Sequence, residues 1–169
     1  LQARDWLPAG SAGLAGAFAA CLLGDEMPRE VVLGRAGDIL LVSGSLSALA
    51  KRQITAAVKA GVTSPVAIAA RSARVACEFL RERETRVAAL FLVGGETARC
   101  VLRALRTRSL WALREMMPGV PVLRVADGPH RGMTIVTKGG NIGDEGTVVE
   151  CLRRLQSLAS GGSAGAARD

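Results

Sequence analysis

The stretch Val87-Ala-Ala-Leu-Phe-Leu-Val93-Gly-Gly-Glu-Thr97 is the part of the sequence that decides the predicted fold. Its first seven residues form an apolar run typical of a buried strand, and two glycines then end that run. A helical pattern over residues 96–106 follows at once. The sequence therefore predicts a strand that passes through a glycine turn directly into a helix.

The same order of strand and helix recurs along the chain. Strands are predicted at residues 38–42, 65–70, 87–93, 110–116, 122–125 and 134–137. Helices are predicted at residues 48–60, 72–86, 96–106 and 145–159. The run at 38–42 is continuously apolar after its first residue, as expected of a strand covered on both faces. A turn is expected at the PGVP segment, residues 118–121. Alternating strands and helices indicate a single α/β domain, a three-layer α/β/α sandwich with a mostly parallel or mixed sheet.

Segments of different composition flank this domain. Residues 12–23 (AGLAGAFAACLL) are apolar but too short to span a bilayer. They follow Asp5 and Pro8 instead of a basic segment, so a buried helix is expected rather than a signal peptide. The predicted organisation is an N-terminal helix and connector at 1–37, an α/β domain at 38–160, and a disordered tail at 161–169.

The composition limits the class of protein. With 169 residues, 49% of them hydrophobic and 22% charged, the chain has an ordinary soluble composition and can bury one core. Four widely spaced cysteines and one histidine argue against a metal site and favour a reduced, cytoplasmic location. No membrane partner is expected, because the apolar stretch at 12–23 is too short to span a bilayer. The net charge of +7 could indicate nucleic acid, but the arginines are dispersed along predicted helices and aromatic residues are only 3%. Solvated helix faces, and no nucleic acid partner, are therefore expected.

Glycines and serines follow three of the predicted strands. The three loops hold the candidate nucleotide-binding residues Ser43, Gly44, Ser45, Ser47, Gly94, Gly95, Glu96, Thr97, Lys138, Gly140, Asn141 and Gly143. Ligands of parallel sheets bind beyond the carboxyl ends of the strands, and glycine loops before helices suit phosphate. Each loop also has a purely structural explanation: helix capping, a tight turn, or a turn with a surface lysine. Together they predict a nucleotide or polyphosphate site, although neither GxxxxGK[ST] nor GxGxxG is present.

Other kinds of site are less well supported by the sequence. The serines of residues 43–47 have no obvious base partner, because the only histidine is His130 in a distant loop, so a serine hydrolase is not expected. No metal cluster is visible, although Glu96, Asp144 or Glu145 could help to hold a nucleotide-bound Mg²⁺.

Taken in order, these motifs resemble the C-terminal nucleotide-binding domain of the four-carbon acid sugar kinases. The matching segments, which span roughly residues 38–155, are SGSLS at 43–47 with Gln53, GGET at 94–97, PGVP at 118–121 with Glu115, and TKGGNIGD at 137–144. Residues 10–15 (GSAGLA) resemble the segment at which the first domain of that family ends. The chain departs from the family pattern at Ile142 and Ala50, and in a short spacing between Ser47 and Gly94.

The resemblance implies an enzyme that transfers the γ-phosphate of ATP, with Mg²⁺, to a hydroxyl of a four-carbon sugar acid of the threonate, erythronate or oxo-tetronate type. In that family a separate N-terminal domain carries the sugar-acid site and much of the catalytic machinery. Residues 1–37 would then come from the end of that missing domain, and the catalytic residues would lie outside this chain. The chain would be a truncated form, a split subunit or a degenerate paralogue, inactive in isolation, and a homodimer is one further expectation.

Two other functions stay open at this point. The chain could be a non-catalytic module that binds a nucleotide or a phosphorylated metabolite. It could also be a basic nucleic-acid-binding protein, whose affinity would fall steeply with salt.

Overall fold

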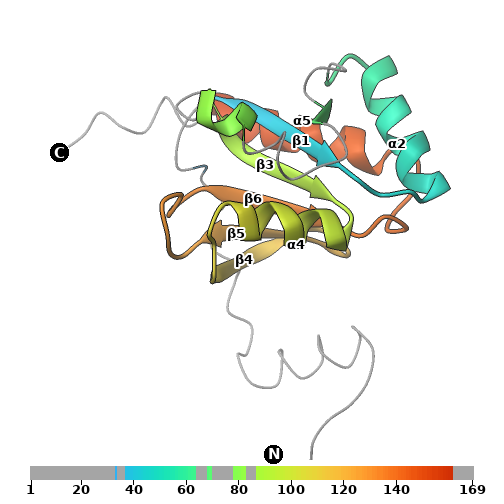
Figure 1. The fold of residues 1–169 in the computed structure, drawn as a ribbon. Coiled ribbons are helices and arrows are strands. Elements are labelled where there is room, and N and C mark those ends of the chain that lie inside the picture. Colours follow the sequence, from blue (N-terminus) through green and yellow to red (C-terminus); the bar gives the residue numbers. More distant parts are fainter. Residues whose placement is uncertain (1–32, 34–36, 64–67, 70–77, 83–86, 162–169) are drawn as a thin grey trace, which may run out of the picture.

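The computed structural model describes residues 33, 37–63, 68–69, 78–82 and 87–161 (Figure 1). Its elements, in chain order, are β1 (Asp38–Ser43), α2 (Ala48–Lys59), β2 (Ile68–Ala69), β3 (Val87–Val93), α4 (Gly95–Ala104), β4 (Leu110–Met117), β5 (Val120–Val125), β6 (Thr134–Lys138) and α5 (Thr147–Gly161). A helical segment also occupies residues 78–82.

The strands form one mixed sheet in the order β2-β1-β3-β6-β5-β4. The first four strands of that order are parallel to one another. The last two form an antiparallel hairpin, whose β5 pairs with β6. Parallel neighbours need a crossover connection, and α4 provides part of one between β3 and β6. The prediction of a mostly parallel or mixed sheet in a single α/β domain is confirmed.

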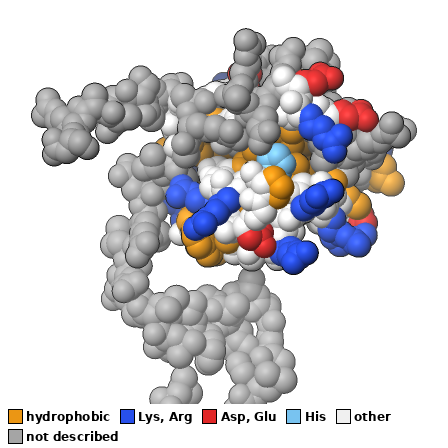
Figure 2. All heavy atoms as spheres, turned by 60° about the vertical axis from the view of Figure 1, so that its left-hand side comes forward, with side chains coloured by type: hydrophobic (Ala, Val, Ile, Leu, Met, Phe, Trp, Pro, Cys, Tyr) orange, Lys and Arg blue, Asp and Glu red, His pale blue; other side chains and the backbone are white. Residues whose placement is uncertain are grey.

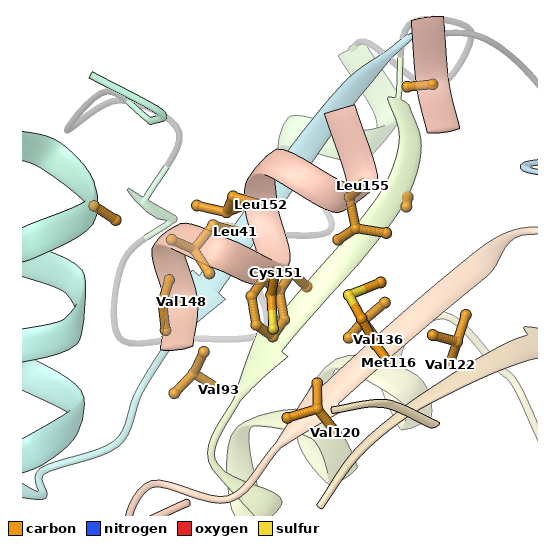
Figure 3. Packing of buried hydrophobic residues seen from close by; sticks show 14 of the residues in the cluster. Leu41, Val93, Met116, Val120, Val122, Val136, Val148, Cys151, Leu152 and Leu155 are labelled. Atoms are coloured by element: carbon orange, nitrogen blue, oxygen red, sulfur yellow. The ribbon is translucent and has the colours of Figure 1, made fainter. Parts of the chain in front are cut away.

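Helices cover both faces of the sheet, which gives three layers (Figure 1). The side chains of β3 show this, because all seven residues are buried and successive side chains point to opposite faces. Phe91 and Val93 pack with α2 and α5, whereas Leu90 and Leu92 pack with α4. Figure 3 shows the first of these cores, where Val148, Leu152 and Leu155 of α5 lie over the sheet. The predicted α/β/α sandwich is therefore confirmed.

Most predicted elements agree with the structure to within a few residues. Helix α5 begins at Thr147 instead of at residue 145, since residues 144–146 form a turn. Strand β5 begins at Val120, two residues earlier than predicted. The predictions for residues 1–32 and 162–169, and most of those for 64–86, lie outside the described residues. Among the described helices, none is long and apolar enough to cross a membrane.

Candidate functional site

The three loops singled out in the sequence meet at one edge of the sheet. Strands β1, β3 and β6 are parallel neighbours, and their last residues are in register: Ser43 pairs with Val93, and Val93 with Lys138. Their arrowheads therefore point to the same side in Figure 1. The loops that follow these strands are brought side by side by this topology alone.

Close backbone contacts join the loops. Gly94 N–H donates to the carbonyl of Lys138 (2.8 Å). A methyl group added to Gly44 would lie 2.5 Å from Oγ1 of Thr97, and one added to Gly140 would overlap the hydroxyl of Ser45. Gly94 has φ +108° and is also close to Ser45. These glycines are thus required where the three loops pack against one another, before any ligand is considered.

Ser47 has a structural task in this arrangement. Its hydroxyl accepts a hydrogen bond from Ala50 N–H (3.0 Å), which caps α2, and donates one to the carbonyl of Gly140 (2.7 Å). Both functions of the hydroxyl are therefore used inside the protein. Ser45 differs, because its Oγ accepts from Ser47 N–H (3.3 Å) and gives its own proton to none of the described residues. Of these two serines, Ser45 is the one with a hydrogen to offer a ligand.

Lys138 is buried and turns back onto its own loop. The side chain is only 2% exposed, and Nζ donates to the carbonyls of Gly139 (2.7 Å) and Ile142 (2.9 Å). Burial lowers the pKa of Lys138 below its ordinary value, since desolvation penalises the ammonium. The geometry gives Lys138 the role of ordering the loop.

Gln53 fastens the same loop to α2. It is fully buried, and its amide nitrogen donates to the carbonyls of Ile142 (3.1 Å) and Asp144. In the sequence, Gln53 stands out only as part of the family pattern, and it is not among the expected site residues. A glutamine on the apolar face of an amphipathic helix was the available signal, because a buried amide needs polar partners.

The outer part of the lysine–glycine loop packs against α5 and the β4–β5 hairpin. Gly143 has φ +75°, and a methyl group there would overlap Thr147, whose hydroxyl donates to Oδ1 of Asp144 (2.9 Å). The hairpin turn touches this loop as well, because a methyl group on Gly119 would lie 3.0 Å from Ile142. Asn141, between these contacts, is exposed.

The N-terminus of α4 is open towards the same edge. Its cap residue is Gly94, which offers no side-chain hydrogen bond, and the first bond of the helix runs from Ala98 N–H to Gly94 O (2.9 Å). The N–H groups of Gly95, Glu96 and Thr97 therefore precede the hydrogen-bond ladder of the helix. Gly95 is exposed, and no atom lies within 4 Å of the position a Cβ would take. A phosphate could approach this backbone without displacing any described side chain.

Glu96 stands beside this open helix end as an exposed carboxylate. Its pKa is lowered to about 2, chiefly by the hydrogen bonds from Arg99 and then by that from Cys100. Arg99 Nε donates to Oε2 of Glu96 (2.9 Å), and a second guanidinium nitrogen also pairs with the carboxylate. The side chain is thus ionised at neutral pH and can accept a hydrogen bond from a hydroxyl or from a metal-bound water.

A pocket of about 320 Å³ opens next to the serine turn. Its wall includes Ser43, Gly44 and Ser45 from the turn, and Lys51, Ile54 and Thr55 from α2. Lys51 is exposed, so its ammonium can move, unlike the buried one of Lys138. Lys51 is not among the site residues expected from the sequence, because a lysine on a helix surface carries no distinctive pattern.

Comparison with known protein families gives one match. The family described as "Nucleotide-binding C-terminal domain" matches residues 56–148, which is more than half of the chain. The matched segment contains the GGET and lysine–glycine loops and begins within α2, after the serine turn. No curated protein sequence matches the chain.

Solved structures share the fold. A domain of unknown function (DUF1537) from Bordetella bronchiseptica, a domain-swapped dimer with bound citrate, superposes with a TM-score of 0.62 at 21% identity over 89% of this chain. A Haemophilus influenzae protein of the DUF1537 family gives a TM-score of 0.62 at 18% identity over 85% of this chain. The chain spans less than half of either structure, 44% and 46% respectively.

Proposed function

The chain belongs to the family of nucleotide-binding C-terminal domains, and from this premise we propose that it is the ATP-binding portion of a kinase. The acceptor in this proposal is a hydroxyl of a four-carbon sugar acid, of the threonate, erythronate or oxo-tetronate type. The observation that carries the proposal is the uncapped N-terminus of α4, which meets the serine turn and the lysine–glycine loop at one edge of the sheet.

In this proposal the phosphates of ATP lie over the start of α4. The N–H groups of Gly95, Glu96 and Thr97 donate to phosphate oxygens, where the positive end of the helix dipole favours negative charge. Ser45 adds its hydroxyl proton, and Lys51 adds a mobile positive charge. Ser47, Lys138 and Gln53 act indirectly, by holding the loops in place.

Mg²⁺ enters the proposal with the nucleotide. Of the three acidic candidates, Glu96 is the one in the first turn of α4, where Arg99 also pairs with its carboxylate. Asp144 accepts from Gly146 N–H (3.0 Å), and Glu145 lies 3.7 Å from Arg52. The Glu96 carboxylate would hold a metal-bound water or a ribose hydroxyl. The metal would neutralise charge on the transferring phosphoryl group, which is what such reactions chiefly require.

The rest of the reaction needs a second domain. The γ-phosphorus would be attacked by the acceptor hydroxyl, ADP would leave, and the hydroxyl proton would pass to a base. Following the family resemblance, we assign that base to an N-terminal domain that also binds the sugar acid. This matches the chain's coverage of less than half of its structural neighbours. A homodimer remains part of the proposal.

A reconstitution experiment tests the kinase function. Mixing the chain with an N-terminal domain of a four-carbon acid sugar kinase should give transfer of labelled phosphate from ATP to threonate, erythronate or oxo-tetronate. Either component alone should give none, and Gly95→Val should abolish the transfer. Binding of ATP without transfer to any of these acids, in every pairing tried, would instead favour a non-catalytic nucleotide-binding module.

A further inference from the structure

A second basic pocket lies at the opposite edge of the sheet from the candidate nucleotide site. It has a volume of about 670 Å³ and is lined mainly by the segment after α4 and by the β5–β6 loop. Figure 2 looks onto the left-hand side of Figure 1, where basic side chains gather around the single histidine. The nucleotide loops lie at the other end of α4, so the two sites do not overlap.

Three arginines line this pocket, and their guanidinium groups make no hydrogen bond with the described residues. Arg103, Arg106 and Arg108 are exposed, and among the described residues none of their guanidinium groups forms a hydrogen bond or an ion pair. One carboxylate, that of Asp127, lines the same pocket. Its Oδ1 is occupied by the backbone N–H groups of Arg108 (3.0 Å) and Ser109 (3.2 Å). The residues that line the pocket therefore include three positive side chains and one negative side chain.

The backbone holds these arginines in a defined arrangement. The end of α4 is a Schellman motif, in which Thr107 N–H donates to Leu102 O and Arg106 N–H to Arg103 O, both at 3.0 Å. A methyl group on Gly128 would lie 3.0 Å from the carbonyl of Arg106, so the β5–β6 loop is packed directly on this turn. Together with the Asp127 bonds, these contacts fix both walls of the pocket.

Arg106 occupies a position at which glycine is the usual residue. It has φ +56°, and among the described residues it is the only one other than glycine with a positive φ. A side chain in this left-handed conformation is strained, and glycine is preferred at this place in a Schellman motif. Strained residues of this kind often mark functional sites. In addition, the buried hydroxyl of Thr107, in the wall of the pocket, has no hydrogen-bond partner among the described residues.

We propose that this pocket, formed by Arg103, Arg106 and Arg108, binds a small metabolite that carries two or more phosphate or carboxylate groups. Guanidinium groups pair with both kinds of anion through two parallel hydrogen bonds, so three of them suit a compact polyanion. This site is separate from the proposed ATP site and does not depend on the kinase function.

Calorimetry with two probes tests the proposal: inorganic pyrophosphate for phosphate ligands and tricarballylate for carboxylate ligands. Wild-type chain should bind at least one of them, and the preferred probe identifies the class of ligand. Arg106→Gly and Arg108→Gln should each weaken binding tenfold or more. Arg106→Gly should at the same time raise the denaturant midpoint, because it relieves the strained conformation. Gain of stability with loss of binding is not expected of a merely solvated arginine.

Two matched variants serve as controls. Arg153→Gln removes one exposed positive charge on α5, outside the pocket, and should change affinity less than twofold. Gly95→Val closes the proposed nucleotide site, at which pyrophosphate could also bind, so binding of the preferred probe at the arginine pocket should persist in this variant. Failure of both probes to bind would overturn the proposal. So would equal losses in Arg106→Gly and Arg153→Gln, loss of binding in Gly95→Val, or binding of RNA without binding of either small anion.

Discussion

Replacing Lys138 by methionine distinguishes a lysine that orders its own loop from one that binds the phosphate of a nucleotide. Methionine keeps the length and most of the packing of the side chain but removes the ammonium. The carbonyl of Gly139 then loses its Lys138 bond (2.7 Å), and that of Ile142 loses one of two donors (2.9 Å). If Lys138 orders the loop, the free energy of unfolding should fall.

The size of the loss follows from these bonds. A hydrogen bond to a charged group contributes about 1.5–3 kcal/mol, so two give an upper limit of about 3–6 kcal/mol. Burial of the ammonium opposes this, as the lowered pKa of Lys138 indicates. We therefore expect Lys138→Met to cost about 1–3 kcal/mol, equivalent to a Tm lower by about 2–12 °C in a chain of this size.

Urea denaturation and calorimetric melting provide the measurement. Lys59→Met is the matched control, because Lys59 is exposed in the last turn of α2, and its loss should cost no more than about 0.5 kcal/mol. If the ammonium were instead a phosphate ligand, Lys138→Met would be as stable as the wild type and would lose most of its affinity for Mg-ATP. That pair of results would refute the loop-ordering role.

Two further variants test the packing of the site and the pH dependence of the protein's stability. Gly143→Ala should lower the free energy of unfolding in urea by about 2–4 kcal/mol, because φ at Gly143 is +75° and the new methyl group would lie 2.9 Å from Cβ of Thr147. The control Gly146→Ala should change the free energy of unfolding by no more than about 0.5 kcal/mol. Equal stability of the two variants would contradict the assigned loop conformation. Burial raises the pKa of the Cys151 thiol to about 11 from its ordinary value of 9.0. Between pH 9 and pH 11 the thiol is therefore ionised in the unfolded chain but still protonated in the folded one. Stability of the wild type should therefore fall from pH 9 to 11 relative to Cys151→Ala, by about 1–2 kcal/mol, and parallel pH profiles would show that the thiol is not buried.

Much of the fold could be predicted from the sequence, because apolar runs and glycine turns are local signals. Strand β3 has the predicted bounds, Val87–Val93, since every one of its residues is apolar and two glycines end it. The start of α5 was placed two residues early because an acidic pair is typical of a first helical turn. In the structure, the Thr147 hydroxyl bonds to Asp144 and holds those residues in a turn instead.

The meeting of the three loops could also be predicted, because parallel strands place their carboxyl ends at one edge. The roles of single side chains could not. Ser47 donates to Gly140, 93 residues away, and Gln53 reaches Ile142, 89 residues away. Such partners are set by the packing of α2 against the lysine–glycine loop, which no local pattern encodes. For the same reason the sequence does not indicate that the Lys138 ammonium is directed to carbonyls of its own loop.

The central claim is that Mg-ATP binds over the uncapped N-terminus of α4. Gly95 offers a clean test, because it is exposed and nothing lies within 4 Å of a new Cβ, so Gly95→Val should fold as the wild type does. Its side chain would fill the space in which a phosphate approaches the backbone. Calorimetric titration should show weak binding of Mg-ATP to the wild type and a loss of tenfold or more in Gly95→Val, about 1.4 kcal/mol or more. Equal affinity of the two proteins for Mg-ATP would contradict the account.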